Sequence, residues 1–192
     1  METRRKTSPR TRLVTGALAA AALAAGTFGA VSASASTPER TQTPAASAAS
    51  AASADRNIHQ TRHLTVDAAT RAAQAALNAA REDGQRVTVA VVDRNGNTIA
   101  VLRGDGAGPQ SYESAERKAY TAVSWNAATS DLVKRLESTP TLKDIPGTLF
   151  LGGGVPVASG GAPIAGIGVA GAPSGALDEE YARAGAAALG TR

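Results

Sequence analysis

Two acidic side chains, Glu113 and Glu116, stand three residues apart in this chain of 192 residues. Side chains at this spacing share one face of a helix, and a helix is expected to begin near Ser111. Carboxylate oxygens of this kind bind hard cations, ferric iron included, and symmetry-related copies of the chain could complete the ligand shell. From spacing alone, the simpler interpretation is a solvated helix whose first turn carries favourable negative charges. The pair is therefore a candidate metal site, with the solvated helix left open.

Few side chains of this sequence could serve as axial ligands to the iron of a porphyrin. It has no cysteine, and its single methionine is the initiator. The remaining ordinary axial donors are His59, His63, Tyr112, Tyr120 and Tyr181. A Ser-His-Asp hydrolase would have to use one of the two histidines, and both precede or open the folded domain rather than line a central cleft. We expect a binding protein and not an enzyme. The competing classes are an enzyme acting on a small carbonyl or hydroxy acid and a structural assembly module without a ligand.

Two short segments are similar in sequence to known binding loops. The run from Gly166 to Gly171 matches the letters of the dinucleotide fingerprint, but that fingerprint needs its glycines in a turn between a strand and a helix. Here the glycines lie inside an apolar run typical of a strand. The segment that begins at Asp93 resembles the start of a calcium loop, but Gly104 stands where the bidentate glutamate is required. We therefore expect a strand and a turn at these places.

The net charge of +4 comes entirely from residues 1–35, which are basic at their start. An Ala-rich apolar run follows at 13–31, and Ala33-Ser34-Ala35 is a typical cleavage site, so residues 1–35 are predicted to be a secretory signal peptide. A retained membrane anchor is the alternative. Residues 36–60 are mostly Ala, Ser, Thr and Pro and are predicted to be a flexible tether. The remainder is formally neutral, which disfavours nucleic-acid binding.

Periodicity and turn signals predict the elements that would position the candidate residues. Thr65 is expected to cap an Ala-rich helix that ends at Gly84 and packs closely against a sheet. Strands are expected at 86–92 and 98–103, joined as a hairpin, and at 148–151, 155–158 and 163–170. Further helices are expected at 111–126, 129–137 and 178–189. The glycine-rich region 145–171 could lie flat against a planar ligand or serve tight packing. The order predicts an α+β fold, an antiparallel sheet flanked by helices.

Several segments together carry a family resemblance that covers residues 62–190. They are Leu64-Thr-Val66, Val89-Ala-Val-Val-Asp93 with Gly96, Ala115-Glu-Arg-Lys-Ala119, Leu151-Gly-Gly-Gly-Val-Pro156, Pro163-Ile-Ala-Gly166 and Ile167-Gly-Val-Ala-Gly171. These segments resemble the GlcG/HbpS family, and the signal peptide and tether bring the chain closest to its secreted haem-binding HbpS branch. The resemblance implies a profilin-like form of the α+β fold over residues 61–192. It also implies homo-oligomers, commonly octamers.

The resemblance further implies an extracellular haem- and iron-binding protein, an accessory redox and iron sensor for the sensor kinase of a two-component system. It implies that Thr148 and His63 contact haem and that Glu113 and Glu116 bind iron. The expected partners are haem, iron ions, further copies of the chain and a membrane sensor kinase. Other branches of the family accompany glycolate or corrinoid metabolism, so a corrinoid or small-acid ligand, or an enzyme of the GlcG branch, stays open.

Overall fold

The structure is a computed structural model and describes residues 57–190. The predicted signal peptide, and all of the predicted tether except residues 57–60, lie outside the described residues. Within 57–190, no helix combines the length and the apolar character that a membrane span needs.

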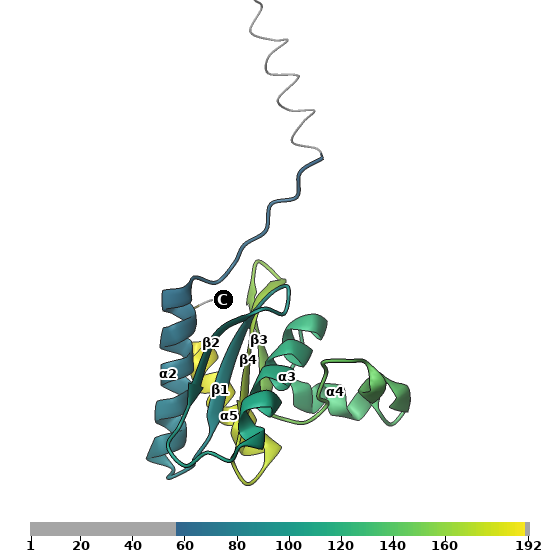
Figure 1. The fold of residues 1–192 in the computed structure, drawn as a ribbon. Helices are drawn as coiled ribbons and strands as arrows, with labels where there is room; N and C mark the ends of the chain where they lie inside the picture. The colour runs from purple at the N-terminus through teal and green to yellow at the C-terminus, as the bar shows by residue number, and fades with distance from the viewer. Residues whose placement is uncertain (1–56, 191–192) are drawn as a thin grey trace, which may run out of the picture. The chain divides into compact units, whose positions relative to one another are not determined.

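The described chain alternates helices with two pairs of strands (Figure 1). In chain order the elements are α2 (Val66–Glu82), β1 (Thr88–Asp93), β2 (Thr98–Arg103), α3 (Gln110–Trp125), α4 (Thr129–Arg135), the 3₁₀ helix η1 (Pro140–Asp144), β3 (Gly154–Ser159), β4 (Ala162–Ala170) and α5 (Gly175–Ala187). This confirms the predicted α+β class.

The four strands form one antiparallel sheet in the order β2-β1-β4-β3. Each outer strand is the hairpin partner of an inner one, and the two hairpins join where β1 pairs with β4, with Val89 opposite Val169 and Val91 opposite Ile167. The first five residues of β1 are buried, as are the last seven of β4. Strands buried on both faces need a helical layer on each side of the sheet.

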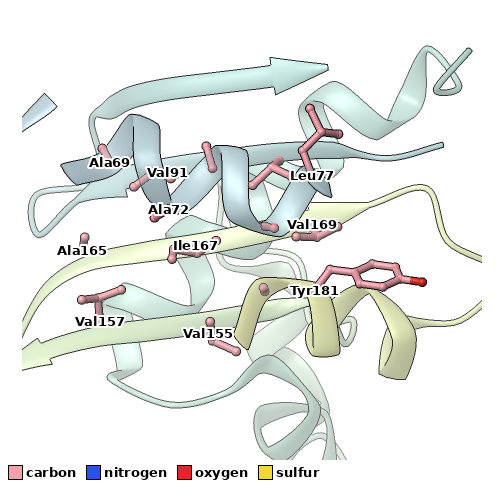
Figure 2. Close-up of a cluster of buried hydrophobic side chains, with 14 of the residues drawn as sticks. Ala69, Ala72, Leu77, Val91, Val155, Val157, Ala165, Ile167, Val169 and Tyr181 are labelled. Atoms are coloured by element: carbon pink, nitrogen blue, oxygen red, sulfur yellow. The ribbon is translucent and has the colours of Figure 1, made fainter. Parts of the chain in front are cut away.

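Helices α2 and α5 share one face of the sheet, and their small residues let them approach it closely. Figure 2 shows Ala69 and Ala72 of α2 and Tyr181 of α5 in one buried cluster with the valines and isoleucine of the strands. Every alanine on the inner face of α2 is fully buried. Thr65 caps this helix by accepting a hydrogen bond from the Ala68 amide at 3.3 Å, as predicted. The predicted packing of the Ala-rich helix against a sheet is confirmed.

Helix α3 covers the opposite face of the sheet and lies close to the backbone of β4. A Cβ atom placed on Gly168 would lie 2.0 Å from the Ala115 carbonyl oxygen, and one on Gly166 would lie 2.2 Å from that of Ala119. These glycines lie within β4, as predicted, and they let the helix touch the strand. Tight packing therefore explains them, and the helix leaves no room for a planar ligand there.

The predicted strand at 148–151 is wrong. Residues 148–150 follow the turn after η1 without pairing, because Thr148 and Leu149 bond to other partners. The Leu149 amide donates to Thr121 Oγ1 of α3 at 2.8 Å, and Thr148 Oγ1 donates to the Ile145 carbonyl at 2.7 Å. The last helix also begins three residues earlier than predicted, because Ser174 caps it by accepting a hydrogen bond from the Leu177 amide.

Candidate functional site

The two predicted iron ligands lie on the first two turns of α3, but their surroundings differ. Glu113 is exposed and forms an ion pair with Arg117 one turn further on. Glu116 is half-buried, and its Oε1 accepts a hydrogen bond from Thr98 Oγ1 of β2 at 2.9 Å. Pro109, at the N-cap position, supplies no capping side chain, so the acidic residue of the first turn complements the helix dipole. The pair lies on one accessible face, as its spacing predicted.

A shallow cavity of about 190 Å³ lies beside Glu116. Its walls come from β1 and β2 with the turn between them, from α3 and from the loop after η1: Val92, Gly96, Thr98, Glu116, Arg117, Tyr120 and Gly147. The Tyr120 ring covers Gly96 so closely that a Cβ atom there would lie 2.5 Å from Tyr120 Cε2. Glu116 therefore faces a small hollow with one aromatic wall.

Thr148 follows the glycine that lines this hollow, and its side chain is turned inward. Only 7% of the residue is exposed. Because its hydroxyl donates to Ile145, only an oxygen lone pair remains for a metal or a ligand donor. The structure brings Thr148 next to the Glu116 cavity, although the residue is not one of those that line it.

His63, the other predicted haem contact, is exposed in the segment before α2, and its Nε2 lies 2.8 Å from Thr61 Oγ1. It lies near Asp93, the first residue of the turn between β1 and β2. Burial acts to raise the pKa of Asp93, but hydrogen bonds from Asn97 and Asn95 and the nearby His63 outweigh it and hold the pKa below its ordinary value. His63 does not line the Glu116 cavity, so the structure does not gather the four predicted site residues into one pocket.

The described residues contain no group of three or more His, Asp or Glu side chains arranged to hold a metal ion. The glutamate pair on α3 therefore supplies at most two protein ligands from one chain. Hard cations take about six oxygen ligands. Water or a second copy of the chain would have to complete such a site.

The three tyrosines differ in their availability as ligands. Tyr112 is 46% exposed, and Tyr120 lines the Glu116 cavity. The hydroxyl of buried Tyr181 donates to Asp83 Oδ2 at 2.9 Å. Burial and this hydrogen bond raise the pKa of Tyr181 to about 12, and the hydroxyl is held inside the domain as a donor to Asp83.

Sequence reasoning missed a buried ion pair between α3 and α5. Lys118 Nζ donates to Asp178 Oδ2 at 2.7 Å and to the Val169 carbonyl at 3.0 Å, and both side chains are almost fully buried. The pair borders a cavity of about 320 Å³ between the N-terminal ends of α3 and α5. One signal was available, because Lys118 interrupts the helix face that Ala115, Ala119 and Ala122 make apolar.

Comparison with known proteins agrees with this fold. The family model described as "Haem degrading protein HbpS-like" matches residues 64–187. A crystal structure of a double mutant of Streptomyces reticuli HbpS, with two glutamates changed to aspartate, is 72% identical, covers 69% of this chain and 91% of its own, and has a TM-score of 0.69. A crystal structure of a PduOC–haem complex is 26% identical over 66% of this chain and 95% of its own, with a TM-score of 0.61.

A curated relative from Citrobacter freundii, an uncharacterized 15.0 kDa protein, is 33% identical over 113 residues, which is 56% of this chain and 80% of that protein. The family match spans α2 to α5, and so includes every strand of the sheet and both glutamates of α3. The chain therefore belongs to the HbpS-like family.

Proposed function

We propose that this chain is an extracellular haem-binding protein that also binds iron on α3. The observation that carries the proposal is the 72% identity to HbpS over 91% of that chain. The PduOC–haem complex supports it, because a relative only 26% identical in sequence binds haem on a similar fold. The signal peptide predicted in residues 1–35 supports the proposed extracellular location.

The residues proposed to contact haem are Thr148 and His63. The cavity beside Glu116 measures about 190 Å³ and two others among the described residues about 300 and 320 Å³, at or below the lower end of the ~300–1,000 Å³ of ordinary ligand pockets. A porphyrin would therefore lie against the surface and be covered by a second copy of the chain.

The iron proposal rests on Glu113 and Glu116. The HbpS double mutant changes two glutamates with the same three-residue spacing, so HbpS carries a pair of the same kind. A homo-oligomer, proposed to be an octamer, would supply further carboxylates from neighbouring copies. A membrane sensor kinase that reads the redox and iron state of the oligomer is the proposed partner.

Haemin titration tests the central proposal. Adding haemin to the purified protein should give a saturable shift of the Soret band, and Thr148→Val or His63→Ala should weaken binding or change the band position. A flat spectrum with intact circular dichroism would contradict haem binding. Because the family description includes haem degradation, the complex should also be followed over hours in air with a reductant, which together supply the dioxygen and the electrons that ring opening consumes. A stable Soret band is expected, and its loss with ring-opened products would show an enzyme instead.

Substitutions at the proposed iron site should change the affinity for ferric iron in opposite directions. Glu113→Gln with Glu116→Gln should remove ferric iron binding and leave the oligomer intact. Arg117→Gln should strengthen iron binding several-fold, because Arg117 competes for the Glu113 carboxylate. Isothermal titration with a ferric chelate measures both. The control is Asp131→Asn with Glu137→Gln, which removes two exposed carboxylates from another region; iron uptake that is equal in all variants would restore the solvated-helix interpretation.

A further inference from the structure

A third cavity, of about 300 Å³, lies between the segment before α2 and the ends of the two hairpins. It is lined by His59, Gln60, Thr61, Arg62, Arg94, Ser159, Gly160, Ala162 and Ile164, and we call it the cationic pocket. Figure 1 shows the segment that leads into α2 passing the ends of the hairpins. The segment is fixed there by a hydrogen bond from Arg62 Nη1 to Ser159 Oγ at 3.1 Å.

Among residues 57–190, the two arginines of this pocket have no carboxylate partner. None of the ion pairs found within residues 57–190 involves Arg62 or Arg94. The nearby carboxylate of Asp93 is hydrogen-bonded within its own turn. Its Oδ1 accepts hydrogen bonds from the amides of Asn95 and Asn97 at 2.8 and 2.9 Å. Two arginines therefore line one cavity, and neither forms an ion pair within the described part of the chain.

The floor of the cationic pocket is apolar. Ile164 of β4 is only 6% exposed, and Ala162 and Gly160 present no polar side chain. A pocket with an apolar floor and an arginine rim fits a ligand that joins a hydrophobic body to a carboxylate, because guanidinium groups pair with carboxylates through two parallel hydrogen bonds. A small inorganic anion would leave the apolar floor uncovered.

We propose that Arg62 and Arg94 bind the carboxylate side chains of the porphyrin, a role that rests on the haem-binding function proposed above. The apolar ring edge covers Ile164, and the two arginines pair with the propionates. Haem then lies at the ends of the hairpins, on the side of the domain where His59 and His63 enter.

The test compares haemin with haemin dimethyl ester, in which both carboxylates are blocked. The wild-type protein should bind haemin about tenfold or more tightly than the ester. Arg62→Gln with Arg94→Gln should weaken haemin binding by a similar factor and leave ester binding unchanged. Protoporphyrin IX, which has the carboxylates but no iron, should show the same dependence on the two arginines.

Arg71→Gln on the exposed face of α2 is the control for loss of positive charge, and it should leave both affinities unchanged. Circular dichroism verifies folding, and Arg62→Lys with Arg94→Lys, which keeps the charge but not the paired geometry, should fall between the wild type and the glutamine variant. Equal binding of haemin and ester, or glutamine variants with unchanged haemin affinity, would overturn this inference and leave the haem function standing. No haemin binding by the wild-type protein would overturn both.

Discussion

Replacing Lys118 with methionine should lower the free energy of unfolding by about 3 to 5 kcal/mol, because the change leaves the Asp178 carboxylate buried without its cation. The side chains of the pair are only 2% and 5% exposed, and Lys118 Nζ lies 2.7 Å from Asp178 Oδ2. Methionine keeps most of the length and volume of lysine, so the loss reports the missing charge rather than a cavity. Urea unfolding followed by circular dichroism measures it.

Removing both charges should cost less than the sum of the two single changes. Burial raises the pKa of Asp178 above its ordinary value, and hydrogen bonding and charge attraction from Lys118, with backbone amides, offset that rise only in part. The carboxylate is therefore costly to bury even when it is paired. Lys118→Met with Asp178→Leu avoids that cost, although the Val169 carbonyl and the Ala172 amide lose a partner. We expect a coupling of at least about 1 kcal/mol.

The exposed pair of Lys134 and Asp131 provides the control for this experiment. Its Nζ–Oδ1 distance is 2.8 Å, close to that of the buried pair, but its side chains are 73% and 63% exposed. Lys134→Met should therefore leave the free energy of unfolding nearly unchanged. Two results would contradict the buried link between α3 and α5 that the structure shows. One is a loss of unfolding free energy for Lys118→Met as small as that of the control. The other is a double variant whose loss equals the sum of the two single losses.

Local signals predicted most of the elements, because their causes lie within a few residues. Thr65 caps α2 through an amide three residues away, and the Asp93 carboxylate closes its turn through two amides within four residues. The strand predicted at 148–151 was wrong, because the composition of this segment suits a strand but its hydrogen-bond partners lie outside the sheet. Leu149 donates to Thr121, 28 positions earlier, and no periodicity records such a contact.

The same distinction applies to the candidate site. Spacing alone placed Glu113 and Glu116 on one face of α3, since helix geometry fixes that relation. The partners that decide their chemistry come from other elements, as Thr98 of β2 does for Glu116. The Lys118–Asp178 pair spans 60 positions, and the Arg62–Ser159 contact spans 97. These contacts depend on the strand order β2-β1-β4-β3, which periodicity does not give.

Gly168→Ala should be the second strongly destabilising change, lowering the free energy of unfolding by about 3 kcal/mol or more. Glycine inside a strand normally destabilises the strand, so replacing it with alanine at an ordinary strand position would stabilise the protein slightly. Here the new Cβ atom would lie 2.0 Å from the Ala115 carbonyl oxygen and 2.5 Å from the Ala119 amide nitrogen. Both atoms belong to the backbone of α3, so no side-chain rotation relieves the overlap.

The control is Ala162→Val at the exposed start of the same strand, which adds bulk to β4 without pressing on a helix. It should leave stability nearly unchanged, since a β-branched residue suits an exposed strand position. The overlap at Gly168 can be relieved only if α3 moves away from the sheet, and Glu113 and Glu116 move with it. Gly168→Ala should therefore weaken the iron binding proposed for this pair, even under conditions where the variant is folded. A variant as stable as the parent would show that α3 does not rest on β4 as closely as the structure places it.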